Sequence, residues 1–588
     1  MSAMIRRFSS ARLPPELKLT NQWARKSKMS APMKSMFSFQ KHLKFKDFGV
    51  ASRLNWLRSC RLISTVAKDT TLELDPQFED FRNGLAKGKV FSYRKHPGVM
   101  NLKRIIVPVK LETTMNKLMN VFEVRDVDKL SAKLGQYLWS RHLPAEAENL
   151  KMTAMKLEAE EINDMSSFDA MSPEEQYKCF NDRKNRVLKK LKNSTYRWES
   201  IRFDAHNSIV YMAARMVQEY SVLLRVLTEI SKRVPDFKPE TFFDFGSGTG
   251  SAMWAANTVW TNSLNEHYCV DVSADMNTLA QLLLQDGNDQ GDMCFKGVAF
   301  RQFLPGSHKN KYDLVISAYS LFELPSASER RKVIENLWKK TDGYLVIVEH
   351  GTNAGFKVIS EAREAVLRMS SLESSGENHL TPMEKKEEVS LVGRIFSPCP
   401  HQSRCPRTND KTPCNFDVGY KPLEYLMKDG KKLERFSYIV FKKGKEQSLS
   451  SSWPRVIRPV SLPARHVHCR LCCPNGKLEH HILTAKKNGQ DLYKCARASG
   501  WGDLLPANQI PAVDKKTSRT SDGVDVDRQF EADESVRDFE DSAESSSSDL
   551  PNVLTHNDSW SSIVNHTYRE EPLEKMDSEE IDTLKPVM

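Results

Sequence analysis

The stretch Phe242–Ala256, "FFDFGSGTGSAMWAA", decides the fold. Its first four residues are mostly apolar, as in a buried strand, and "SAMWAA" is composed of good helix formers. Gly246, Gly248 and Gly250 lie between the two segments. Glycine lets the backbone turn sharply and approach a ligand closely, and the following helix presents unpaired N–H groups. The stretch therefore predicts a strand, a tight turn and a helix, with a ligand at the turn.

Similar units follow along the chain. The runs "TFFDF", "HYCVDV", "YDLVISAYSLFEL" and "GYLVIVEH" are rich in Val, Ile, Tyr and Phe without clean alternation, as expected of strands buried on both faces. Helical segments such as "SERRKVIENLWKKT" separate them. Strands that alternate with helices imply right-handed crossovers and a parallel, doubly wound sheet. We expect this α/β domain to span residues 235–395.

Two acids accompany the glycines. Asp244 lies two residues before the first glycine, and Asp271 ends the next strand, where its carboxylate can accept hydrogen bonds from ribose hydroxyls. A dinucleotide-binding loop has its third glycine one residue later, so the pattern D-x-G-x-G-x-G instead resembles the first motif of class I methyltransferases. That resemblance implies S-adenosylmethionine as cofactor, bound by Asp244, Gly246, Gly248, Gly250 and Asp271. The alternative is a Rossmann-like turn without a ligand.

Signals for catalysis are weaker than signals for binding. Amino-methylating enzymes of this class often carry an Asn/Asp-Pro-Pro-aromatic motif after the fourth strand, where this chain reads "SAYSLFELP". Methylation of cytosine C5 needs a nucleophilic thiolate, and no cysteine follows this strand closely. The catalytic residues are therefore unknown, and the sequence supports a ligand site better than a reaction.

The flanking regions differ strongly in charge. From Asp514 onward the chain has 20 acidic and 8 basic residues, so this tail carries a net charge of −12. Because the whole chain has a net charge of +11, the residues before Asp514 carry +23. A basic body of that kind favours a polyanionic partner such as RNA. The Ser-rich acidic tail, residues 514–588, is expected to be disordered.

The first 68 residues hold 15 Lys/Arg and two acids, which is typical of a mitochondrial transit peptide; a basic RNA-binding arm is the alternative. Residues 89–234 are expected to form a helical N-terminal domain, because apolar residues recur there at spacings of three and four. No apolar run is long enough to span a membrane.

The 11 cysteines are too unevenly distributed for a disulfide framework. Cys399, Cys405 and Cys414 form C-x5-C-x8-C, with spacings wider than zinc knuckles use. Prolines follow the first two of these cysteines, as in some loops that bind iron–sulfur clusters. Four thiolates suit either zinc or a cluster, so a fourth ligand must come from elsewhere in the chain.

Several ordered motifs identify a resemblance that covers roughly Leu111 to Pro506. They are "SLFELP", "YLVIVEHGTNAGFKVISEAR", "CPHQSRCP" and "RHVHCRLCCPNGKLEHHILTAKKNGQDLYKCARASGWGDLLP". With the glycine loop, they resemble the methyltransferase-like protein 17 family of mitochondria, which includes a fungal mitochondrial small-subunit ribosomal protein. The resemblance implies a matrix factor that binds the rRNA of the assembling small ribosomal subunit and carries S-adenosylmethionine and a [4Fe–4S] cluster. Mitochondrial translation would require it.

The resemblance also implies a ligand set for the cluster. It places Cys472 as the fourth ligand beside Cys399, Cys405 and Cys414, within a cysteine-rich extension spanning residues 396–510. Cys473 is the adjacent alternative and Cys469 a weaker one. Zinc is the alternative metal, with His401, His466 and His468 as further candidate ligands.

The prediction is therefore a class I methyltransferase-like domain with a helical N-terminal domain and a cysteine-rich metal-binding C-terminal extension. We expect a monomeric assembly factor of the mitochondrial small subunit. The alternatives are an active S-adenosylmethionine-dependent rRNA methyltransferase and a DNA-binding or zinc-dependent regulatory protein.

Overall fold

The computed structural model describes residues 70–85, 92–122, 125–162, 172–196, 198–307, 309–374, 391–423, 432–444 and 452–511. The transit peptide expected at 1–68 and the acidic tail expected at 514–588 lie outside these residues. The chain divides into two compact units, Met1–Pro144 with Trp198–Ala512, and Ala145–Arg197 with Val513–Met588. No helix in the described part of the chain is long and apolar enough to cross a membrane.

The larger unit is built on one eight-stranded sheet. Five strands run parallel in the order β4-β3-β2-β5-β6, and β9 then pairs antiparallel with β6. Both β7 and β8 pair antiparallel with β9. The strands are β2 (Thr241–Phe245), β3 (Glu266–Val270), β4 (Val298–Arg301), β5 (Tyr312–Ala318), β6 (Thr341–His350), β7 (Gly393–Ser397), β8 (Phe416–Tyr420) and β9 (Lys432–Lys443).

This strand order confirms the predicted fold class. In chain order the parallel strands lie 3-2-1-4-5 across the sheet, with an antiparallel strand next to the fifth. That is the doubly wound, Rossmann-like arrangement of class I methyltransferases. In it, the order of the strands reverses beside the first strand, and this reversal leaves a crevice at the carboxyl ends of the strands. The glycine loop follows β2, so it lies at this crevice.

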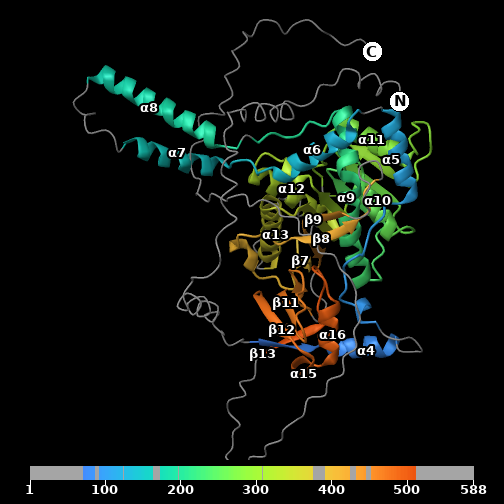
Figure 1. Ribbon diagram of the computed structural model, residues 1–588. Coiled ribbons are helices and arrows are strands. Elements are labelled where there is room, and N and C mark those ends of the chain that lie inside the picture. Colours follow the sequence, from blue (N-terminus) through green and yellow to red (C-terminus); the bar gives the residue numbers. More distant parts are fainter. Residues whose placement is uncertain are drawn as a thin grey trace, which may run out of the picture. The chain divides into compact units, whose positions relative to one another are not determined.

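Helices cover both faces of the sheet. Neighbouring residues of a strand point to opposite faces, so the apolar side chains of these strands need helices to pack against on each side. Phe242 packs into one core with α9 (Ala205–Arg233), α10 (Ser251–Val259) and α11 (Ala274–Leu284). Phe243 packs into a second core with α12 (Ala327–Lys340) and α13 (Asn353–Ser374). The result is a three-layer α/β/α domain, labelled in Figure 1.

The helices expected before the sheet are present. They are α5 (Val109–Val121), α6 (Val127–Ser140), α7 (Ala147–Ile162), α8 (Pro173–Ser194) and the 29-residue α9. The side chain of Asp204 caps α9 by accepting a hydrogen bond from the backbone N–H of Asn207, at 2.8 Å. α5, α6 and α9 belong to the larger unit.

The described part of the smaller unit is a helical pair, α7 and α8. A capping box between Ser172 and Glu175 begins α8. Glu161 of α7 accepts ion pairs from Arg186 and Lys190 of α8, which join the two helices.

The C-terminal part of the larger unit adds a small sheet that the sequence did not predict. Its order is β10-β11-β12, formed by Arg455–Val456, Val467–Cys472 and Leu478–Leu483. α16 (Gln490–Ala498) packs against it, and β1 (Thr70–Leu74) pairs with β13 (Ala507–Pro511). The remaining short elements here are α4 (Pro76–Leu85), η1 (Tyr93–Lys95), η4 (Pro406–Asn409) and α15 (Ala485–Asn488).

Candidate functional site

The glycine loop has the geometry that its sequence requires. Gly246, Gly248 and Gly250 all adopt positive φ angles, +70°, +50° and +81°. A Cβ atom on Gly246 would lie 2.2 Å from the Cβ of Ser320, because the loop approaches the end of β5 closely. A larger residue at position 246 would therefore have to move the chain.

The loop borders a cavity of about 340 Å³, within the size range of cofactor pockets. Asp244, Gly246, Gly248 and Asp271 line this cavity, so the structure brings four of the five predicted cofactor residues together. Gly250 is not among the lining residues; it is the N-cap of α10, in the left-handed conformation.

The two acids of this cavity differ in how they are held. Asp271 Oδ2 accepts the Gly248 N–H at 2.9 Å, and its Oδ1 accepts the Ser273 N–H, also at 2.9 Å. Burial raises the pKa of Asp271, and these two bonds work against that shift. Asp244 is buried, and one of its oxygens, Oδ2, has no hydrogen-bond partner. Burial, then the charges of Asp271 and Glu219, raise the pKa of Asp244 well above its usual range.

A buried acceptor without a partner is destabilising unless a ligand supplies a donor. The Asp244 oxygen, the positive-φ glycines and the size of the cavity together fit an S-adenosylmethionine site. Of the residues predicted to bind it, Asp244, Gly246, Gly248 and Asp271 line the cavity and would hold it, whereas Gly250 does not line the cavity.

An ion pair between Arg141 and Glu323 lines the cavity, at the side where the chain continues beyond β5. Arg141, which follows α6, binds both carboxylate oxygens of Glu323, with its Nη2 lying 3.1 Å from Oε2. The same oxygen accepts the backbone N–H of Ile201 at 3.1 Å. Glu323, which belongs to the motif "SLFELP", thus accepts three hydrogen bonds, two from Arg141 and one from Ile201. Its carboxylate is therefore not free to act as a general base.

The cysteine-rich stretch forms a loop between β7 and β8 that faces the end of β11. Burial raises the pKa of the Cys472 thiol well above its usual range, and the thiols of Cys399, Cys414, Cys405 and Cys473 raise it further. Burial and the other loop thiols raise the pKa of Cys414 in the same way. The four predicted ligands therefore lie near one another, and the alternative fourth ligand Cys473 lies near Cys472 as well.

Strand alternation distinguishes Cys472 from its neighbours. Cys469 and Cys473 are buried in the core of the small sheet, whereas Cys472 lies on the opposite face of β11. The Sγ of Cys472 lies 3.4 Å from Nε2 of His401, so the cysteine loop also brings a histidine beside this thiol.

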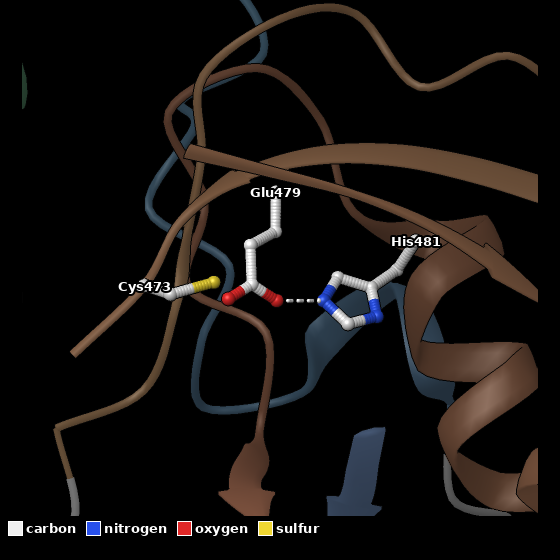
Figure 2. Close-up of side chains that lie close together, drawn as sticks. All are labelled: Cys473, Glu479 and His481. Atoms are coloured by element: carbon white, nitrogen blue, oxygen red, sulfur yellow. Dashed lines mark hydrogen bonds and ion pairs between the residues drawn. The ribbon is translucent and has the colours of Figure 1, made fainter. Parts of the chain in front are cut away.

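Cys473 belongs to a different polar group, with Glu479 and His481 (Figure 2). The ligand atoms of these three residues lie within 4.8 Å of one another. Glu479 already accepts four hydrogen bonds, at 2.7–2.8 Å, from Thr70, Asn475, His481 and Gln509. A carboxylate with four donors is satisfied without a cation, and this group ties β1 and β13 to β12.

A buried carboxylate anchors the cysteine loop to the core. Glu229 of α9 accepts hydrogen bonds from Ser397 at 2.7 Å and from the Arg455 guanidinium at 2.6 and 3.2 Å. Arg455 also donates to the carbonyl of Pro398 at 3.0 Å, next to Cys399. The position of the first cysteine thus depends on residues far away in sequence. Sequence reasoning missed Glu229, and no local motif marks it.

Comparisons with known proteins identify the family to which the chain belongs. A model of the family described as "Mitochondrial small ribosomal subunit Rsm22" matches residues 205–506. The human protein named "Ribosome assembly protein METTL17, mitochondrial" is 39% identical over 427 residues, covering 73% of this chain and 88% of its own length. "Ribosome assembly protein RSM22, mitochondrial" of Saccharomyces cerevisiae is 23% identical over 429 residues, covering 51% of this chain and 66% of its own length.

A solved structure was also matched. Magnesium protoporphyrin IX methyltransferase (ChlM) of Synechocystis PCC 6803, with bound SAM, is 14% identical with a TM-score of 0.22, and the match covers 44% of this chain and 96% of that one.

Proposed function

Because the chain belongs to the family of the mitochondrial small ribosomal subunit protein Rsm22, we propose that it assembles the small ribosomal subunit in the mitochondrial matrix. In this proposal the protein binds small-subunit rRNA as a monomer. It uses S-adenosylmethionine and a [4Fe–4S] cluster as resident cofactors, and mitochondrial translation requires it.

The names of the relatives support the general role. The human and the yeast proteins are both named mitochondrial ribosome assembly proteins. The single observation that carries the proposal is the 39% identity to the human protein over 88% of its length. The excess of basic residues before Asp514 supports a polyanionic partner, for which rRNA is our proposal.

The pocket supports the cofactor. S-adenosylmethionine would occupy the cavity beside the glycine loop, with its ribose hydroxyls donating to Asp271. It would also meet the unpartnered oxygen of Asp244 with a donor. Cofactor binding would then stabilise the folded protein, by an amount that increases with the logarithm of the free cofactor concentration.

The cysteines support the metal. Cys399, Cys405, Cys414 and Cys472 would hold the cluster, and their gathering at the small sheet is the observation in favour. Iron neutralises thiolates that burial otherwise disfavours, so cluster binding would stabilise the folded C-terminal region directly. The domains that we propose remain 89–234, 235–395 and 396–510.

One experiment tests the role against its rival, an active rRNA methyltransferase. The chain is depleted in its organism and replaced by the wild type or by Asp271→Asn, and mitochondrial ribosomal particles are separated on gradients. We expect depletion to remove small subunits while large subunits persist, and the wild type to restore them. Unchanged small subunits on depletion would exclude an assembly role.

The rival is tested on the same material. Purified protein, labelled S-adenosylmethionine and small-subunit rRNA should give no stoichiometric methyl transfer. Labelled rRNA at one methyl per chain or more, lost in Asp271→Asn, would establish the methyltransferase instead.

A further inference from the structure

A basic groove lies next to the cysteine loop. Its volume is about 710 Å³, and 22 residues line it, including Cys399 and His401. None of these lining residues is Asp or Glu, whereas the charged ones are Lys232, Arg233, Arg394, Lys442 and Arg455. A concave surface with charge of one sign concentrates counter-ions of the other sign.

Two of these cations lie directly opposite each other on neighbouring strands. Arg394 of β7 and Lys442 of β9 are direct partners in an antiparallel pair. Like charges at directly opposite positions destabilise a sheet. Burial lowers the pKa of Lys442, and the charge of Arg394 lowers it further, as expected of side chains that lie close together. Two cations at this position would both be within reach of one bound anion.

Aromatic rings contact two of the groove cations, Arg233 and Lys442. The Arg233 guanidinium lies 4.0 Å from the ring centre of Phe396, whose ring lies 5.3 Å from that of Tyr344. The Lys442 ammonium lies 5.8 Å from the same tyrosine ring. These contacts fix the charges before any ligand arrives, which reduces the entropy lost on binding.

The groove cations are separate from those that balance the thiols. The arginines that act on the Cys405 and Cys414 thiols are Arg363, Arg407 and Arg455. Of these, only Arg455 also lines the groove, where it is committed to Glu229. Neither Arg394 nor Lys442 is among the cations that act on these two thiols.

Resting on the proposed rRNA-binding function, we propose that this groove binds the phosphates of a single-stranded RNA segment beside the cysteine site. The volume admits a few nucleotides but not a duplex, and Trp453 in the lining offers an aromatic side chain on which a base can stack. Because Pro398, Cys399 and Pro400 form one wall, loss of the metal would deform the groove and weaken RNA binding.

The test uses the iron-loaded full chain and a labelled single-stranded fragment of small-subunit rRNA, with binding followed by fluorescence anisotropy over a range of salt. Arg394→Gln/Lys442→Gln removes two charges. For single strands each contact contributes about 0.7 to the slope of log K against log salt, so the slope should fall by about 1.4 and the affinity about tenfold at 0.15 M salt. The matched control, Arg331→Gln/Lys332→Gln on α12, removes two exposed charges and should change neither value.

A second variant separates binding from structure. Lys442→Glu creates an opposite-charge pair with Arg394, so the melting temperature should stay equal or rise while RNA affinity falls and iron content stays constant. A fall in melting temperature together with lost iron would assign the two cations to folding and overturn the proposal.

Other outcomes are equally decisive. An unchanged salt slope in both groove variants, with wild-type protein that binds RNA, would refute the groove but leave the proposed function standing. Wild-type protein that binds no RNA would refute the function itself. Loss of poly-glutamate binding with RNA binding retained would assign the groove to an acidic protein, and displacement of RNA by millimolar inorganic phosphate would assign it to a small anion.

Discussion

Replacing Glu229 by glutamine should strongly destabilise the protein. Both carboxylate oxygens are buried, and together they accept six hydrogen bonds at 2.6–3.2 Å. The donors are Arg225, Arg233, Ser397, Tyr438 and Arg455, the last of which contributes two of the bonds.

The magnitude follows from the charges left behind. Glutamine preserves the shape but removes the negative charge, so the buried guanidiniums of Arg225 and Arg455 lose their counter-ion. Removing one partner of a buried ion pair typically costs about 3–5 kcal/mol. We expect a loss in this range, and a lower iron content, because Arg455 supports Pro398 next to Cys399.

The pH dependence has a defined sign. Although burial raises the pKa of Glu229, the charges of Arg455, Arg225 and Arg233 outweigh it and hold the pKa well below its usual range. The contribution of this carboxylate is therefore present above its unfolded pKa, near 4.5, and is lost as the pH falls through the folded value. The difference between wild type and Glu229→Gln should shrink in acid.

The assay is urea unfolding of anaerobically prepared protein, followed by circular dichroism, with Glu364→Gln at an exposed position of α13 as the matched control. The control should lie within about 0.5 kcal/mol of the wild type. A Glu229→Gln loss below about 1 kcal/mol at neutral pH would refute the account of this anchor.

Two further predictions concern the pocket, and a third concerns Glu349, a buried residue of β6. Asp271→Asn should weaken S-adenosylmethionine binding at least tenfold in calorimetry, since hydrogen bonds to a charged group contribute about 1.5–3 kcal/mol; equal affinity would remove Asp271 from the site. Gly246→Ala should lower both stability and cofactor affinity, because the new Cβ would lie 2.2 Å from the Cβ of Ser320; a wild-type melting curve would contradict the close approach. Burial and then Glu323 raise the pKa of Glu349 to about 8, so Glu349→Gln should stabilise the protein above the unfolded value near 4.5, gaining up to about 1.4 kcal/mol per pH unit until pH 8, with no gain at pH 4. A gain independent of pH would assign it to packing.

The parallel sheet was predictable because its signals are local. The predicted strand "TFFDF" has the same first and last residues as β2. The three glycines that follow it adopt positive φ angles, as a tight turn after the strand requires. The same local logic located Asp244 and Asp271 at the cavity. Short-range chemistry is sufficient where a strand, its turn and its helix are contiguous.

The cysteine site was predictable only in part. The loop spacing pointed to a metal, but Cys472 came from a family resemblance, since no local pattern distinguishes it from Cys473. The strand alternation of β11 makes that distinction, and it becomes visible only once the small sheet is known. Glu229, Arg394 and Lys442 carry no motif at all, because their roles arise from contacts between distant segments.

We propose that four cysteines, with Cys472 as the fourth, hold an iron–sulfur cluster in a factor for the mitochondrial small subunit. The iron, sulfide and zinc content of anaerobically purified wild type, Cys472→Ser and Cys473→Ser tests this proposal most directly. We expect about four irons and four sulfides per chain in the wild type and in Cys473→Ser, and their loss in Cys472→Ser. One zinc per chain, or iron that survives Cys472→Ser but not Cys473→Ser, would contradict it.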